Sequence, residues 1–162
     1  MNKSTININR ENLPYRKCVG IMLLNKNREV FVGQRIDNKA DAWQMPQGGI
    51  EDGEDLIFAA KRELLEEIGT NNIEIISQAQ GWYSYDIPDY LIPKFWNGKY
   101  RGQTQMWYLA NFLGEDSEIN INTEIPEFTA WKWSKPWDLP AIIVPFKRDL
   151  YKGLLEEFKD FL

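Results

Sequence analysis

The sequence predicts an α/β domain of the α+β type, in which a mixed β-sheet packs against helices. Several short runs rich in β-branched and aromatic residues predict strands, and two segments show helical periodicity. No repeat, low-complexity tract or linker divides the 162 residues. With 43% hydrophobic residues, a chain of this length can bury a single core without disulfides. We therefore expect residues 1–162 to form one domain.

The first half of the chain predicts two strands, a loop and a helix. Residues 18–25 and 30–34 are apolar runs on either side of a charged turn, which favours a hairpin or neighbouring strands. Residues 35–47 have no periodicity and end at a glycine pair, so they predict a loop. Residues 55–68 follow a helical pattern, and Gly69 supplies a stop signal.

The second half predicts further strands and a closing helix. Four strands are expected, several of them rich in aromatic residues, at residues 73–76, 80–85, 103–112 and 129–134. The stretch between Ile87 and Gly102 contains proline and glycine, and it predicts a long functional loop. Residues 146–161 are amphipathic and predict a C-terminal helix.

The composition excludes several classes of function. The chain has no histidine, so it cannot use Ser–His or Cys–His catalysis or histidine-bound zinc. Its net charge of −5 argues against a basic face that coats duplex DNA. It lacks both a signal peptide and an apolar run of the roughly 20 residues that span a bilayer. Together with the single Cys18, this predicts a cytoplasmic protein without membrane contact.

Three carboxylates gather on one side of the predicted mid-chain helix. Glu63, Glu66 and Glu67 stand at positions i, i+3 and i+4, so they lie within an arc of roughly 100 degrees. Their mutual repulsion would be relieved by a hard divalent cation such as Mg²⁺ or Mn²⁺. For this spacing alone, a solvated acidic face is the more common outcome. The acidic arc also carries Ala59 and Ala60, whereas the other side is expected to hold the large apolar residues Ile57, Phe58, Leu64, Leu65 and Ile68.

The residues around this helix form a longer pattern. A glycine-punctuated loop, residues 48–54, leads into the helix and allows the backbone to approach a ligand closely. The full spacing is Gly48, five residues, Glu54, seven residues, Arg62-Glu63-Leu64, one residue, Glu66-Glu67, one residue and Gly69. This spacing resembles the signature of the Nudix hydrolases, the Nudix box, here residues 48–70. It departs at the last position, where that family usually has an aliphatic residue and this chain has Thr70.

The resemblance implies a fold, an activity and a set of site residues. The fold would be a mixed β-sheet sandwiched between helices, and the activity a metal-dependent hydrolysis of nucleoside diphosphates linked to another group. Glu63, Glu66 and Glu67 would bind Mg²⁺ or Mn²⁺, one of them also assisting as base, and Gly48 would offer its carbonyl oxygen. Arg62 and Glu54 would form an ion pair that fixes the loop on the helix. Glu127 is a further candidate ligand, with a solvated loop carboxylate as the alternative.

Beyond the box, the chain resembles one branch of the family, the bacterial RNA pyrophosphohydrolases and the related dinucleoside polyphosphate hydrolases. The residues that carry this likeness are Pro14-Tyr15-Arg16, Val19-Gly20, residues 43–49, Gly102-Gln103, Gln105, Trp107, Pro126-Glu127-Phe128, Trp131, Trp133 and residues 145–148. The chain departs from the branch at Lys17, commonly proline there, and at Thr104 and Met106, often lysine there.

Several residues outside the box are candidates for holding the substrate. A polyphosphate would need cations in a chain of negative net charge, and the candidates are Arg16, Arg35, Lys147 and Arg148. The alternative for each is plain surface charge, and for Arg148 the two are about equally favoured. Phe146 would stack on a base or belong to the core. Gln103 and Gln105 share one face of a predicted strand and would line the groove.

Three functions remain open at this point. The chain would remove pyrophosphate from 5′-triphosphorylated RNA, hydrolyse a dinucleoside polyphosphate such as diadenosine tetraphosphate, or bind nucleotides or RNA without catalysis. A silent binder would be expected to lack one of the box glutamates, and all are present. The sequence does not distinguish the two substrates, and it leaves open whether a protein partner stimulates activity.

Overall fold

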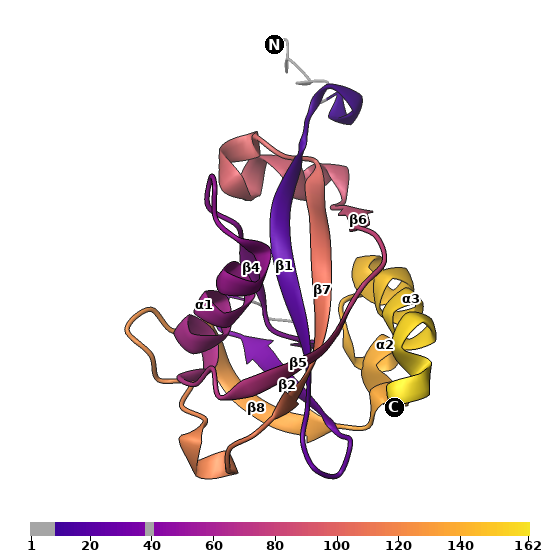
Figure 1. Cartoon of the computed structure of the whole chain (residues 1–162). Coiled ribbons are helices and arrows are strands. Elements are labelled where there is room, and N and C mark those ends of the chain that lie inside the picture. Colours follow the sequence, from indigo (N-terminus) through magenta and orange to yellow (C-terminus); the bar gives the residue numbers. More distant parts are fainter. Residues whose placement is uncertain (1–8, 38–40) are drawn as a thin grey trace, which may run out of the picture.

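The computed structural model describes residues 9–37 and 41–162. Its strands belong to one mixed sheet, with the order β3-β2-β1-β7-β5 (Figure 1), while β4 pairs with β1, β6 with β7 and β8 with β2. The strands are β1 (Tyr15–Leu24), β2 (Val30–Arg35), β3 (Trp43–Gln44), β4 (Gln47–Gly49), β5 (Ile73–Gln78), β6 (Tyr83–Asp86), β7 (Gly102–Phe112) and β8 (Phe128–Ser134). The α-helices are α1 (Leu56–Ile68), α2 (Leu139–Ile142) and α3 (Arg148–Phe158). The predicted fold class is confirmed.

The centre of the sheet is a parallel pair formed by β1 and β7. Their register runs from Tyr15 opposite Gly102 to Leu24 opposite Asn111. Helix α1 lies on one side of these strands and α3 on the other (Figure 1). Because helices cover both faces, every residue from Cys18 to Leu24 is buried, and the strand is continuously apolar where a half-exposed strand would alternate.

Helix α1 begins and ends close to the predicted positions. The Asp55 side chain accepts a hydrogen bond from the backbone N–H of Phe58 at 3.1 Å, which caps the first turn. At the other end Gly69 adopts φ of +78°, and its N–H donates to the carbonyl of Leu65. A left-handed conformation of this kind favours glycine, so the stop signal has a direct structural cause.

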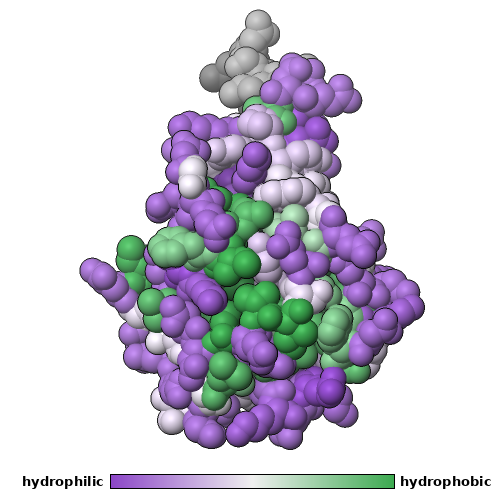
Figure 2. Space-filling model, viewed as in Figure 1, coloured by the Kyte–Doolittle hydropathy of each residue, from purple (hydrophilic) through white to green (hydrophobic). Residues whose placement is uncertain are grey.

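The face that α1 turns to the sheet differs from the expected one. Ile57, Phe58 and Leu65 are exposed, at 41%, 61% and 46%. The buried residues of the helix are Ala59, Ala60, Leu64, Glu67 and Ile68. The two alanines allow the helix to approach β1 and β4 closely, so the side that packs on the sheet includes a carboxylate. Figure 2 shows hydrophobic surface in the middle of the face that carries α1.

Some loops and boundaries also differ from the predictions. The expected loop at residues 35–47 contains β3 and the first residue of β4, which are too short to show periodicity; residues 38–40 of that loop lie outside the described range. The strand expected at 80–85 begins only at Tyr83. The expected loop after Ile87 contains two 3₁₀ helices, Asp89–Lys94 and Trp96–Gly98.

The predicted C-terminal helix is present as α3, and a 3₁₀ turn lies at each of its ends. The short helix α2 was not predicted. Five residues of α3 face the core, and they are Leu150, Tyr151, Leu154, Leu155 and Phe158. Among the described residues, no helix has the length and apolar character needed to cross a bilayer.

Candidate catalytic site

One pocket brings together most of the predicted site residues. It has a volume of about 330 Å³ and receives side chains from β1, β2, β4, α1, β7 and the start of the C-terminal helical segment. Of the residues expected from the sequence, it is lined by Gly48, Glu63, Glu66, Glu67, Glu127, Arg16, Arg35, Gln103, Phe146 and Lys147. Carboxylates and cations thus share one cavity, although they come from distant parts of the sequence.

Two glycines allow charged side chains to lie directly against β4. A Cβ atom on Gly48 would stand 2.0 Å from the carboxylate of Glu63, and one on Gly49 would stand 2.2 Å from the guanidinium of Arg16. Both distances are far below van der Waals contact, so any larger residue at these positions would push the Glu63 carboxylate or the Arg16 guanidinium aside. The backbone of Gly48 therefore lies against the Glu63 carboxylate, as a shared cation site would require.

Glu67 is a buried carboxylate with incomplete pairing. The residue is 4% exposed, and its Oε2 has no hydrogen-bond partner among the described residues. Burial raises the pKa of Glu67 well above its ordinary value, and repulsion from Glu63 and Glu127 adds to the increase. The backbone N–H of Gln47 acts in the opposite direction. A buried oxygen without a partner is costly, and a cation would supply the missing interaction.

The other carboxylates are arranged around Glu67. Burial raises the pKa of Glu63 to about 7, while Arg62 acts against that increase. Glu66 and Glu127 are exposed. No group of three carboxylates among residues 9–37 and 41–162 already forms a metal-binding cluster. The donors are all oxygens, and this donor set together with the unpaired Oε2 fits a hard divalent cation.

Arg62 holds the loop before α1 in place. Its Nε and Nη2 donate to the two carboxylate oxygens of Glu54 at 2.6 and 2.8 Å, which is the ion pair implied by the resemblance. Nη2 also donates to the carbonyl of Gly49 at 2.9 Å, and Nη1 to Glu63 at 3.0 Å. The guanidinium lowers the pKa of Glu54 to about 2. One side chain therefore connects the loop, β4 and a carboxylate of the pocket.

Replacing this side chain should damage activity indirectly. In Arg62→Ala, the Glu54 loop loses its anchor, so we expect kcat/KM to fall by roughly 10–100-fold, as when a group that orients ligands is removed. Arg62→Lys should recover little, because an ammonium cannot make the two parallel hydrogen bonds. Steady-state kinetics and thermal unfolding would be compared with Lys61→Ala, a neighbour outside the pocket. Full activity with an unchanged Tm would show that the anchor is not needed.

The cations line the same pocket as the carboxylates. Lys147 is 5% exposed and its ammonium lies 5.2 Å from the ring centre of Tyr85; burial lowers its pKa to about 7. The guanidinium of Arg16 lies 5.7 Å from the ring centre of Trp96. Arg35 is paired with Asp37 at 2.6 Å. Cations and carboxylates around one cavity suit a phosphate chain bridged by a metal ion.

Two predicted substrate residues lie outside the pocket. Arg148 is exposed on α3 and donates from Nε to the carbonyl of Pro140 at 2.9 Å, so the expectation that it faces the phosphates is wrong. Gln105 is 1% exposed and does not line the pocket, because Gln103 lies between it and the cavity. Phe146 lines the pocket and also packs against the core, so it is placed where a base could reach its ring, and base stacking stays a prediction.

Sequence reasoning missed several residues of the pocket wall, which are Gln44, Gln47, Tyr85, Ile87, Phe95 and Trp96. Phe95 and Trp96 belong to the loop after Ile87 that was expected to be functional, so its length and its aromatic residues were the available signal. Gln47 immediately precedes the box.

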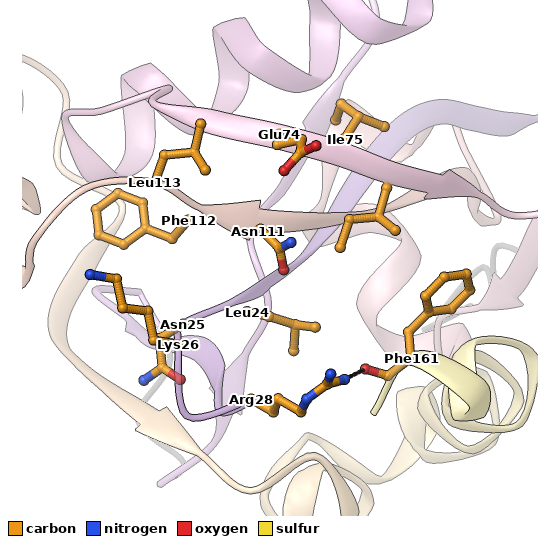
Figure 3. A pocket seen from close by; sticks show the side chains of 11 residues that line it. Leu24, Asn25, Lys26, Arg28, Glu74, Ile75, Asn111, Phe112, Leu113 and Phe161 are labelled. Carbon is orange, nitrogen blue, oxygen red and sulfur yellow. Dashed lines mark hydrogen bonds between the residues drawn. The ribbon is translucent and has the colours of Figure 1, made fainter.

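A larger cavity, of about 700 Å³, lies at the opposite end of β1 and β7 (Figure 3). Its walls include Leu24, Asn111 and Phe161, and Arg28 reaches across to donate to the carbonyl of Phe161. Glu74 is the only carboxylate among its lining residues. The chemistry expected from the sequence therefore belongs to the smaller pocket.

Sequence comparison finds a family model and relatives that cover most of the chain. Residues 14–154 match the NUDIX domain. A protein of Rickettsia conorii named RNA pyrophosphohydrolase is 54% identical over 150 residues, which cover 93% of each chain. A protein of the same name from Sphingopyxis alaskensis is 54% identical over 153 residues, covering 93% of this chain and 97% of the relative.

Solved structures show a similar fold at lower sequence identity. An Ap4A hydrolase of C. elegans, in a binary complex, has a TM-score of 0.65 and 22% identity, covering 90% of this chain and 96% of its own. The dihydroneopterin triphosphate pyrophosphohydrolase of E. coli has a TM-score of 0.64 and 21% identity, covering 86% and 96%. At these identities the likeness concerns the fold alone.

Proposed function

The chain belongs to the NUDIX domain family, and from this premise we propose that it is a metal-dependent RNA pyrophosphohydrolase. It would remove pyrophosphate from 5′-triphosphorylated RNA and leave a 5′-monophosphate. The observation that carries the proposal is the 54% identity, over 93% of the chain, to a protein named RNA pyrophosphohydrolase. The pocket supports it, because it places cations and carboxylates around one cavity.

The carboxylates of the pocket would perform the hydrolysis. Glu63, Glu66, Glu67 and Glu127, with the carbonyl of Gly48, would hold Mg²⁺ or Mn²⁺. When bound, the ion would neutralise phosphate oxygens and acidify a water molecule. One of the four carboxylates would take the proton of the water that attacks phosphorus. Arg62 and Glu54 would keep the loop in place during this step.

The cations of the same pocket would bind the substrate. Arg16, Arg35 and Lys147 would hold the phosphate chain through charge-assisted hydrogen bonds. The ring of Phe146, 5.9 Å from that of Tyr85, would carry the first base. We infer that residues 1–162 work as a single domain in the cytoplasm, where a buried free thiol such as Cys18 stays reduced.

A direct comparison of two substrates tests the proposal. We expect kcat/KM for a short 5′-triphosphorylated RNA to equal or exceed that for diadenosine tetraphosphate at the same metal and salt concentrations. Phe146→Ala should cost about 1–3 kcal/mol on the RNA, because a stacked base loses its platform. Hydrolysis should stop in excess chelator.

The opposite preference would favour the alternative. A dinucleotide preferred by more than about a hundredfold, near 2.7 kcal/mol in transition-state binding, would assign the chain as a dinucleoside polyphosphate hydrolase. Binding of both substrates without turnover of either, in saturating Mg²⁺ or Mn²⁺, would indicate a silent binder.

A further inference from the structure

A chain of hydrogen bonds runs from a buried tryptophan to the wall of the pocket. Nε1 of Trp107 donates to Oε1 of Gln105 at 2.9 Å. Nε2 of Gln105 donates to Oε1 of Gln103 at 2.6 Å and to Oε1 of Gln47 at 2.5 Å. Gln103 and Gln47 line the pocket, whereas Gln105 and Trp107 lie behind them. These hydrogen bonds thus connect the core to the cavity.

Trp107 determines how the three glutamine amides of this hydrogen-bond network are oriented. An indole N–H can only donate, so the atom of Gln105 that faces Trp107 must be the amide oxygen. The amide nitrogen of Gln105 is then directed to Gln103 and Gln47. Because that nitrogen also only donates, both neighbours must turn their oxygens toward it. Their own nitrogens therefore point away from Gln105.

Trp107 is held rigidly enough to impose this order. The residue is 0% exposed, and a Cβ atom on Gly20 would come within 2.5 Å of its ring. The ring of Tyr151 meets it edge to face at 6.2 Å, and the Tyr151 hydroxyl accepts a hydrogen bond from the N–H of Met45 at 2.9 Å. With the indole fixed on these sides, reversal of Gln105 would leave the indole N–H unsatisfied in the core.

Gln103 and Gln47 are the outer members of this network. Nε2 of Gln103 has no hydrogen-bond partner within the described part of the chain, and this side chain lines the cavity. Gln47 turns its Oε1 to Gln105 and lies in the pocket wall together with Tyr85. Burial raises the pKa of Tyr85, and Gln47 acts against that increase.

We propose that Gln105 is a positioning residue: held by Trp107, it turns the amide nitrogen of Gln103 into the pocket as a donor for the phosphate oxygens of the substrate. The inference rests on one part of the proposed function, namely that the phosphates of the substrate bind in this pocket. With the amide reversed, Gln103 would present a carbonyl oxygen to the phosphates and repel them. Gln105 acts without touching the substrate.

Gln105→Glu tests this role, because a carboxylate still accepts from Trp107 but has no N–H for Gln103. Gln103 should then turn its nitrogen inward and its oxygen into the pocket. We expect the Kd for inorganic tripolyphosphate, measured by calorimetry, and the KM for 5′-triphosphorylated RNA to rise about tenfold or more, the scale of one hydrogen bond to a charged group. The value of kcat should change much less, and the Tm would be recorded alongside.

A double-mutant cycle separates amide orientation from the added charge. Gln103→Met removes the amide that can be turned, so Gln105→Glu in that background should weaken tripolyphosphate binding far less than it does in the parent. Equal losses in both backgrounds, or an unchanged Kd in Gln105→Glu, would overturn the inference. Tripolyphosphate binding requires no turnover. A parent that fails to hydrolyse RNA would therefore refute the proposed function, while the cycle would still decide the role of Gln105.

Discussion

Glu67→Gln should abolish most of the hydrolytic activity while making the metal-free protein more stable at pH 8. The amide keeps the shape of the side chain but removes a ligand charge, so we expect kcat to fall by roughly 10²–10³-fold, as when one group that stabilises transition-state charge is lost. The carboxyl of Glu67 is buried with an unpaired oxygen, and the neutral amide avoids the cost of ionising it there.

The pH dependence provides a second measurement of the same substitution. The pKa of Glu67 is raised in the folded chain, so above pH 4.5 the unfolded chain releases a proton that the folded chain retains. Stability attributable to this group is therefore lost as the pH rises from 4.5 toward the folded pKa. In excess chelator, the Tm difference between Glu67→Gln and the parent should grow from pH 5 to pH 8. Glu74→Gln, an exposed carboxylate on β5, is the matched control, and a Glu67→Gln enzyme with near-parental turnover would contradict the assignment.

Lys147→Met should produce the next largest effect. The ammonium is buried in the wall of the pocket, where we propose that it binds phosphate, so its loss should lower kcat/KM on 5′-triphosphorylated RNA by about 1.5–3 kcal/mol, the value of a charge-assisted hydrogen bond. Steady-state kinetics would measure this loss. Lys152→Met, an exposed position on α3, is the control. Parental kcat/KM in Lys147→Met would remove this residue from the phosphate site.

The contribution of Lys147 to stability should change with pH in the opposite direction to that of Glu67. Burial lowers the pKa of Lys147 from 10.5 to about 7. Between these values the unfolded chain holds a proton that the folded chain has released, so the stability contributed by this group rises with pH. The metal-free parent should therefore gain Tm relative to Lys147→Met between pH 7 and pH 9.5. Parallel Tm curves over that range would show that the ammonium is not desolvated.

The sequence predicted the chemistry of the site better than its packing. The glutamates and their partner Arg62 could be located because their spacing along one helix is short and regular. The face of α1 could not, because a hydrophobic pattern does not reveal that two alanines, Ala59 and Ala60, allow a closer approach than Ile57 or Phe58 would. Burial of Glu67 follows from that approach, and so does its raised pKa.

Sequence patterns also could not predict which side chains the fold brings into the pocket. Arg148 and Lys147 are adjacent in the sequence, yet only Lys147 enters the pocket, because the chain turns into α3 between them. Gln105 lies on the same strand face as Gln103, as expected, but only Gln103 lines the pocket. The short strand β4 has no periodicity and is recognisable only from its pairing with β1.

The parallel pairing of β1 with β7 also limits the order in which parts of the fold can form during synthesis. The paired residues are 87 positions apart, as for Tyr15 and Gly102, so a long loop must close before β1 gains this neighbour. A growing chain carries the apolar strand β1 with one unpaired edge until β7 has been made, and such an edge invites association with other chains. The pocket also needs Lys147, so its wall is complete only after this later residue has been made and β7 has paired with β1.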